Sequence, residues 1–235
     1  FEMDSFKDDN NSISEEMLTD VIQNYDAMVT TVSNQITKNQ LKEKRIQLIS
    51  NIAVGFDNID LEAAKKERVS ITNTPDTLNE TTAEMAVTLL LNAMRKVKLH
   101  QHHHAQGNCS HWRPFFELGS ELRGKEIGIV GLGRIGKEIA RILHYGFNCQ
   151  INYLKNETIH QLEFPTNPMS HKDFFSTQKV IILSAPLNKK TTHIIDTKEI
   201  ILLNTGAILV NIGRGELVNQ EALTDNLQKF SAIAT

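Results

Sequence analysis

The segment from Ile127 to Ala140 constrains the fold more than any other part of the chain. It consists of an apolar run, a turn with the spacing G-x-G-x-x-G, and a stretch with helical periodicity. In such a turn Gly131 permits a tight bend, Gly133 lets the backbone approach a pyrophosphate, and Gly136 lets helix and strand pack closely. The start of the helix also directs unpaired N–H groups at phosphates. The segment therefore predicts a dinucleotide site, and the alternative is a turn that only packs well.

The residues that follow the turn agree with this interpretation. Arg134 and Ile135 fill the two positions before the third glycine, and we include them in the predicted cofactor site. Apolar residues then recur at helical spacing as far as Leu143. Gly146 is placed to end the helix.

Composition excludes several classes of function. The chain has 235 residues, a formal net charge of -3 and no basic stripe, so nucleic acid is not an expected partner. No apolar run reaches the roughly 18 residues that cross a bilayer, so no membrane partner is expected. Cys109 and Cys149 have neither disulfide nor metal-site spacing, which is typical of a reducing compartment. We expect a soluble, cytoplasmic protein.

The first third of the chain alternates predicted helices with predicted strands. Strands are expected over 27–32, 46–53 and 69–74. Helices are expected from the capping-box spacing at Ser12–Glu15 to about Tyr25, over 38–44 and after Asp60. This alternation is typical of a parallel sheet that is covered on both faces. Pro75 closes the unit, so we predict a first domain over residues 1–76 and a second over 77–235.

The second domain opens with one long predicted helix, which starts at the capping-box spacing of Thr81–Glu84 or slightly earlier at Asn79. It is expected to run to about Gln106, with Gly107 as its stop. Alternation then resumes after Lys125. Further strands are expected over 150–154, 180–183, 207–212 and 232–234, and helices over 196–203 and 219–230. Residues 155–178 show no regular pattern.

Several short motifs along the chain occur in the same order and spacing as in a known family. They are Val54–Asp60, Asn73–Asp76, Thr82–Glu84, the glycine turn, Ser184–Leu187 and Asn211–Gly215. Together they resemble the D-isomer-specific 2-hydroxyacid dehydrogenases. Trp112-Arg113-Pro114 and Asn211–Asn219 look most like the glyoxylate/hydroxypyruvate reductases within that family.

The resemblance implies an α/β fold with two Rossmann-like domains. Residues 1–76 would be a flavodoxin-like, substrate-binding domain, and residues 77–235 a doubly wound, dinucleotide-binding domain. It also implies a nicotinamide cofactor, a small 2-oxoacid or 2-hydroxyacid substrate, and a homodimer. Trp112 resembles an aromatic residue that reaches the active site of a neighbouring subunit, and the alternative is an ordinary core tryptophan.

The family's catalytic machinery is an arginine, an acidic residue and a histidine. Only the arginine, Arg214, has a match here, because the other two lie beyond the point that matches Thr235. The first strand of the substrate domain and the segment that completes it also have no match. We therefore expect a fragment or truncated product of such an enzyme, missing sequence at both ends and inactive by itself.

Arg214 is the predicted catalytic and substrate-binding residue. It follows a predicted buried strand, and ligands gather at the carboxyl ends of parallel strands. A guanidinium stays charged and presents a planar fork that can hold both the carboxylate and the carbonyl of a 2-oxoacid. Val54 and Gly55 match the loop whose backbone amides hold the substrate carboxylate in the family.

The choice of nicotinamide cofactor depends on the strand after the glycine turn. An acidic residue about 20 positions on normally binds the adenosine ribose of NAD. Here the strand ends in Leu154, followed by Lys155, which would attract a 2′-phosphate. NADP(H) is therefore preferred, with NAD(H) as the alternative.

The resemblance also implies contacts to the nicotinamide half of the cofactor. In the family these contacts come from the residues that match Ala185 with Pro186 and Ile212 with Gly213.

The sequence has three other interpretations. His100 and His104 have a spacing that could chelate a metal, but no nearby Cys, Asp or Glu completes a set, so no metal is expected. The rival function is a dinucleotide-sensing binding protein, similar to the corepressors that resemble these dehydrogenases. A degenerate product of a disrupted reading frame is a third interpretation.

Overall fold

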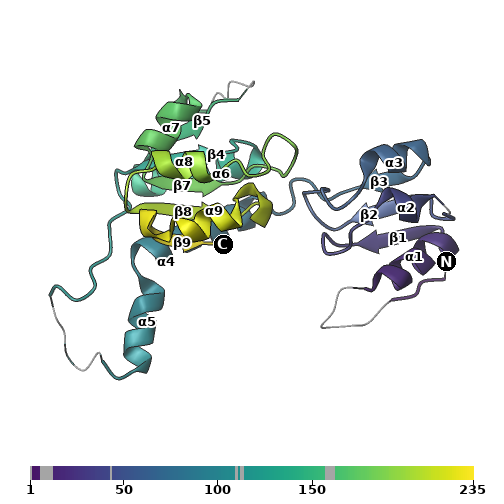
Figure 1. Ribbon diagram of the computed structural model, residues 1–235, viewed down its shortest axis with the longest axis horizontal. Helices are drawn as coiled ribbons and strands as arrows, with labels where there is room; N and C mark the ends of the chain where they lie inside the picture. The colour runs from purple at the N-terminus through teal and green to yellow at the C-terminus, as the bar shows by residue number, and fades with distance from the viewer. Residues whose placement is uncertain (1, 6–12, 43, 109–110, 112–113, 157–161) are drawn as a thin grey trace. The chain divides into compact units, whose positions relative to one another are not determined.

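The structure, a computed structural model, describes residues 2–5, 13–42, 44–108, 111, 114–156 and 162–235. The chain forms two compact units, residues 1–78 and residues 79–235 (Figure 1). Each unit contains its own sheet, and every strand pair in both sheets is parallel. The predicted α/β class, with two parallel sheets, is confirmed.

The first unit contains a sheet of three strands in the order β1-β2-β3. The strands are β1 (Ala27–Thr30), β2 (Leu48–Asn51) and β3 (Ser70–Thr72), and the helices are α1 (Glu15–Asn24), α2 (Lys38–Leu41) and α3 (Leu61–Lys66). Local capping starts two of these helices, because Ser14 accepts from the Met17 N–H and Asp60 accepts from the Ala63 N–H. The strands occupy the predicted places but are shorter than expected.

The second unit contains a sheet of six strands in the order β6-β5-β4-β7-β8-β9. The strands are β4 (Glu126–Val130), β5 (Gln150–Leu154), β6 (Thr166–Met169), β7 (Val180–Leu183), β8 (Ala207–Asn211) and β9 (Phe230–Ala234). The helices are α4 (Asn79–Met94), α5 (Val97–Ala105), α6 (Arg134–Phe147), α7 (His171–Thr177), α8 (Thr197–Leu202) and α9 (Gln220–Asp225).

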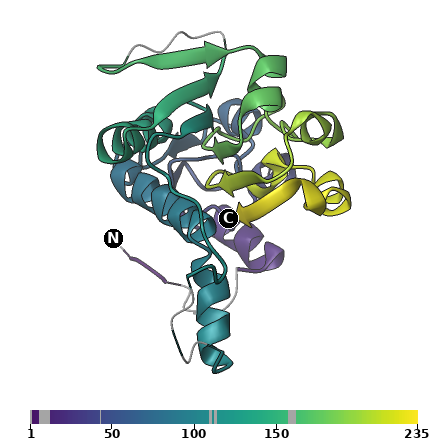
Figure 2. The same cartoon turned by 90° about the vertical axis from the view of Figure 1, so that its left-hand side faces the viewer.

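Helices cover both faces of this sheet, as Figure 2 shows for α4 and α6 on one side and α7, α8 and α9 on the other. Each face of the sheet has its own hydrophobic core, and neighbouring residues of one strand point into different cores. On β7, Ile182 packs into the core under α4 and α6, and Ile181 packs into the core under α7, α8 and α9. Strands that are apolar on both faces are typical of a parallel sheet between two helical layers.

The strand order reverses between β4 and β7. From β4 the chain moves outward through β5 and β6, and then it returns to the other side of β4 to form β7, β8 and β9. In open parallel sheets, ligands bind outside the carboxyl ends of the strands at such a reversal. The glycine turn directly follows β4, so it lies at this point of the fold.

Three predictions about helices were wrong. The helix expected over residues 219–230 ends at Asp225, and a short 3-10 helix follows over Leu227–Lys229. The long helix expected over residues 79–106 is two helices, because Lys96 adopts a left-handed conformation with φ 52° and ψ 38° between them. The helix after the glycine turn does not end at Gly146 but continues through Phe147 to Asn148, which has φ 52°. Phe147 packs against the core, so the extra residues bury apolar surface. The stop expected at Gly107 is confirmed, since α5 ends at Ala105.

Residues 155–178, which show no regular sequence pattern, contain two elements that the sequence did not predict, β6 and α7. Pro168 lies in β6, which tolerates it because β6 is an edge strand. Ser170 then caps α7 by accepting a hydrogen bond from the Asp173 N–H at 3.2 Å. Among the helices described, none combines the length and the apolar character that crossing a bilayer requires.

Candidate functional site

The glycine turn links the end of β4 to the start of α6. Gly131 has φ 97°, in the region that favours glycine. A Cβ atom on Gly131 would lie only 2.5 Å from the Ala185 nitrogen and 2.6 Å from the Ala185 Cα. Backbone of the segment after β7 therefore packs directly on this residue, and any larger side chain would force the two strands apart.

The other two glycines of the turn have different surroundings. A Cβ atom on Gly136 would collide with the Gly131 carbonyl oxygen and lie 3.0 Å from the Ser184 hydroxyl. A Cβ atom on Gly133 would meet no atom within 4 Å. Gly136 thus has the close-packing role expected from the sequence, and the positive φ of Gly131 agrees with the tight bend expected there. The space at Gly133 leaves room for a ligand, and its contact with a pyrophosphate stays a prediction.

The start of α6 is suited to an anion. Gly133 occupies the N-cap position, and the first turn of the helix contains no acidic residue. Arg134 and Lys137 lie in this first turn, Arg134 with an exposed side chain and Lys137 half-buried. The N–H groups at the start of a helix of 14 residues, together with these cations, favour a phosphate at this position.

The ends of β7 and β8 meet beside the glycine turn. Ala185 and the exposed Pro186 follow β7, and Ile212 and Gly213 follow β8. A Cβ atom on Gly213 would lie 3.0 Å from the Ala185 carbonyl oxygen, so the two segments are in contact. Because Ala185 also packs on Gly131, the structure brings three of the predicted cofactor-binding segments together at one edge of the sheet.

The loop that carries Arg214 is held by Asn211, a residue that is only 8% exposed. Asn211 Oδ1 accepts from the Gly213 N–H at 3.0 Å, and Asn211 Nδ2 donates to the Arg214 carbonyl oxygen at 2.8 Å. The half-buried Arg214 side chain donates from Nη1 to the Gly213 carbonyl oxygen at 3.2 Å. Asn211 therefore fixes the backbone from which the guanidinium extends.

Sequence reasoning assigned no role to the Asn211 side chain. A signal was present, because asparagine often accepts a hydrogen bond from the backbone two residues on and so closes a turn. An asparagine at a strand end, two residues before a glycine, is a suitable place for this.

Lys155 lies at the same edge of the sheet, one strand further from the centre. Leu154 is the last residue of β5, which pairs with β4, and the exposed Lys155 follows it directly. The Lys155 N–H donates to the Met169 carbonyl oxygen at 3.0 Å, which fixes the backbone at this position. Residues 157–161 lie outside the described residues.

Val54 and Gly55 follow β2 in the first unit. Both of their carbonyl oxygens accept from asparagine side chains, Val54 from Asn73 at 3.0 Å and Gly55 from Asn51 at 2.9 Å. Asn51 also donates to the buried Asn58 at 3.3 Å. Among the described residues, the N–H groups of Val54 and Gly55 donate to no acceptor. The loop is therefore held by its carbonyls while its amides stay available to an anion.

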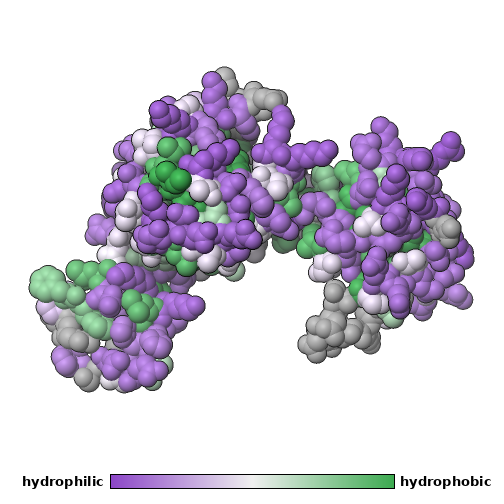
Figure 3. Space-filling model, viewed as in Figure 1, coloured by the Kyte–Doolittle hydropathy of each residue, from purple (hydrophilic) through white to green (hydrophobic). Residues whose placement is uncertain are grey.

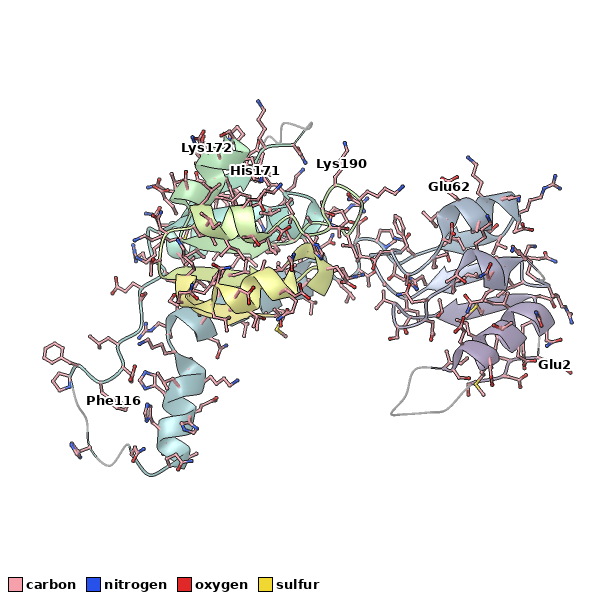
Figure 4. All side chains as sticks on the ribbon, in the orientation of Figure 1. Glu2, Glu62, Phe116, His171, Lys172 and Lys190 are labelled. Atoms are coloured by element: carbon pink, nitrogen blue, oxygen red, sulfur yellow. The ribbon has the colours of Figure 1, made fainter. Side chains whose placement is uncertain are left out.

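The histidines of α5 have other contacts. His100 Nε2 lies 3.1 Å from the Glu117 carbonyl oxygen, and the His103 ring packs against Phe116 with centroids 4.8 Å apart. Phe116 is labelled in Figure 4. Within the described ranges, no three His, Cys, Asp or Glu side chains come together as metal ligands would.

Trp112 and Cys109 fall outside the described residues. Burial raises the pKa of the Cys149 thiol, which lies away from the strand ends described above.

Comparison with known proteins identifies the family. The model of the NAD binding domain of D-isomer specific 2-hydroxyacid dehydrogenases matches residues 87–233. The chain belongs to this dehydrogenase family. The glyoxylate reductase of Pyrococcus horikoshii is 36% identical to this dehydrogenase chain over 230 residues, which cover 94% of the chain and 68% of that protein.

Solved structures share the fold of this 2-hydroxyacid dehydrogenase chain. The TT0316 protein of Thermus thermophilus gives a TM-score of 0.87 at 28% identity, over 96% of this chain and 73% of that one. An acyclic imino acid reductase in complex with NADPH and D-Arg gives 0.84 at 25% identity, over 94% and 71%. The D-lactate dehydrogenase of Aquifex aeolicus, in complex with NAD and lactic acid, gives 0.82 at 26% identity, over 92% and 65%.

The open position at Gly133 gives a direct test of dinucleotide binding. Aspartate is a favourable N-cap residue, and the position has space, so Gly133→Asp should not lower the unfolding midpoint. Its carboxylate would repel a pyrophosphate, so the Kd for NADPH or NADH should rise at least ten-fold, about 1.4 kcal/mol. Fluorescence titration and thermal melts of the same samples provide both values.

Gly133→Ser is the matched control, because it is an equally good cap without the charge. It should weaken binding less than Gly133→Asp. Equal affinity of Gly133→Asp and the wild type would mean that the ligand does not lie over the start of α6.

Proposed function

We propose that this protein catalyses reversible hydride transfer between a nicotinamide cofactor and a small 2-oxoacid, glyoxylate or hydroxypyruvate. The observation that carries the proposal is the placement of Arg214, held by Asn211 at the carboxyl end of β8 beside Ala185 and Gly213. A rigid cation next to the segments that line the nicotinamide half suits a substrate with adjacent carboxylate and carbonyl groups. The glyoxylate reductase relative supports this choice of substrate.

The residues of the chain divide the work as follows. The Arg214 guanidinium binds the substrate carboxylate and polarises the carbonyl, which becomes more negative as hydride arrives. For Val54 and Gly55, in the first unit, the role that the resemblance implies is to bind a substrate carboxylate through their backbone N–H groups. The bound nicotinamide supplies the hydride. The resemblance assigns the proton donor to a histidine that has no match among residues 1–235, so the kinetic tests are made on an active enzyme that contains this sequence.

We propose NADP(H) as the preferred cofactor. Lys155 extends from the end of β5, where a dinucleotide on the glycine turn would place its adenosine ribose, and residues 154–156 contain no carboxylate. A lysine there attracts a 2′-phosphate, whereas the carboxylate of NAD enzymes would repel it. The two similar structures in complex with NADPH and with NAD support either cofactor on this fold.

A homodimer formed through the segment around α5 is part of the same proposal. No residue of α5 is buried, and the segment that returns beside it exposes 85% of Phe115 and 62% of Leu118. Figure 3 shows this apolar surface in green at the lower left. A helix with no buried face gains little from its own chain, so a second copy is the partner that would stabilise it.

The cysteine spacing and the absence of a bilayer-length apolar run in the sequence favour the cytosol as the compartment.

Arg214→Lys tests the catalytic assignment. Lysine keeps the charge but loses the planar fork, so at least one charge-assisted hydrogen bond of about 1.5–3 kcal/mol is lost. We expect kcat/KM for glyoxylate to fall by ten-fold or more. Arg141→Lys, an exposed arginine on α6 that pairs with Glu138, is the control and should leave the rate unchanged. Unchanged kinetics for Arg214→Lys would remove the residue from the active site.

Lys155→Asp tests the cofactor assignment. Reversing the charge should repel the 2′-phosphate and create a ribose acceptor, so the ratio of KM for NADPH to KM for NADH should rise at least ten-fold. The control is Lys179→Asp, an exposed lysine that precedes β7 at the opposite edge of the sheet. A wild-type preference for NADH would contradict the assignment.

Sedimentation equilibrium tests the dimer. The wild type should have the mass of two chains, and the double variant Phe115→Glu with Leu118→Glu should have the mass of one, because two buried charges oppose association. Ile201→Glu, which alters a residue of α8 that is 61% exposed, should remain a dimer. A monomeric wild type, or a dimeric double variant, would contradict this part of the proposal.

A further inference from the structure

Ser184 links the two strands between which the sheet order reverses. It is the first residue after β7, and its N–H donates to the Val130 carbonyl oxygen at 2.9 Å, which continues the pairing with β4. Its hydroxyl donates to the Gly131 carbonyl oxygen at 2.6 Å. The side chain thus extends the contact between the strands by one residue, into the glycine turn.

The same hydroxyl also borders the third glycine of the turn. Ser184 Oγ lies 3.0 Å from the position of a Cβ atom on Gly136, and the backbone from Ser184 to Ala185 packs on Gly131. Ser184 therefore contacts the turn at both its first and third glycine. The Ser184 residue is half-buried in this corner.

The bond to Gly131 determines how one peptide group of the turn is oriented. In a planar trans peptide the carbonyl and the following N–H point in opposite directions. Because Ser184 holds the Gly131 carbonyl toward β7, the Leu132 N–H points away from β7. Among the described residues, the Leu132 N–H donates to no acceptor. The bond thus fixes the entry into the start of α6, where the pyrophosphate is proposed to bind.

We propose that Ser184 is a positioning residue for dinucleotide binding. Its hydroxyl holds the peptide between Gly131 and Leu132 so that the turn keeps the shape that receives a pyrophosphate. The proposal rests on the proposed placement of the cofactor on the glycine turn. It concerns affinity for the pyrophosphate, not contact with the nicotinamide.

Ser184→Ala tests this role, with Ser231→Ala as a matched control. Ser231 Oγ donates to the Gly206 carbonyl oxygen at 3.0 Å, a bond of the same kind, but at the start of β8 and so at the opposite edge of the sheet. Affinities for NADPH and for ADP-ribose are measured on the full chain, well below each variant's unfolding midpoint. ADP-ribose retains the pyrophosphate and lacks the nicotinamide.

We expect Ser184→Ala to raise the Kd for NADPH and for ADP-ribose by about ten-fold each, about 1.4 kcal/mol. Ser231→Ala should leave both affinities unchanged. Ser184→Cys, which keeps the size of the side chain and a weak donor, should give intermediate values, and it decides the question if Ser184→Ala does not fold.

Two results would overturn the inference alone. One is a wild type that binds NADPH together with a Ser184→Ala variant whose two affinities are unchanged. The other is a variant that loses affinity for NADPH but not for ADP-ribose, since Ser184 would then act at the nicotinamide. A wild type that binds neither NADPH nor NADH would overturn the proposed function, and this inference with it.

Discussion

The close packing of the glycine turn against the segment after β7 is the constraint on which the rest of the site depends. Gly131 lies against the backbone of Ala185, and Gly136 lies against the Gly131 carbonyl. A side chain at Gly131 would separate the turn from the segment after β7, and one at Gly136 would push α6 away from the turn. Either change would displace the start of α6 from the strand reversal. The same contact sets the position of Ala185, which in turn packs against Gly213. Backbone contacts of Ala185 with Gly131 and with Gly213 thus connect the proposed pyrophosphate site to the proposed nicotinamide site.

Side-chain hydrogen bonds to backbone then fix the loops that leave the strand ends. Asn211 holds the loop of Arg214, Ser184 holds the glycine turn, and Asn51 with Asn73 holds the loop of Val54 and Gly55. In each case a polar side chain forms a hydrogen bond with a backbone carbonyl or N–H group that has no partner on a neighbouring strand. Each loop held in this way is ordered before any ligand arrives, so little binding energy is lost in ordering that loop.

Local patterns in the sequence predicted the parts of the fold that depend on local physics. Glycine spacing indicated the turn, and alternating apolar segments indicated two parallel sheets. The failures have non-local or competing causes. The helix over residues 79–106 breaks at Lys96 because Ser120, from the returning segment, donates to the Met94 carbonyl and supports the end of α4 there. Gly146 and Asn148 can both adopt a left-handed conformation, and burial of Phe147 favours the later stop. The role of Ser184 joins residues 53 positions apart, so no local pattern could predict it.

The central claim is that a nicotinamide dinucleotide lies across the strand reversal and presents its hydride to a 2-oxoacid on Arg214. A crystal structure of the full-length protein with NADPH and oxamate, which mimics a 2-oxoacid, tests it most directly. The account predicts the pyrophosphate over Gly133 at the start of α6, the 2′-phosphate within reach of Lys155, and the oxamate carboxylate on the Arg214 guanidinium. A dinucleotide bound elsewhere, or oxamate without contact to Arg214, would contradict it.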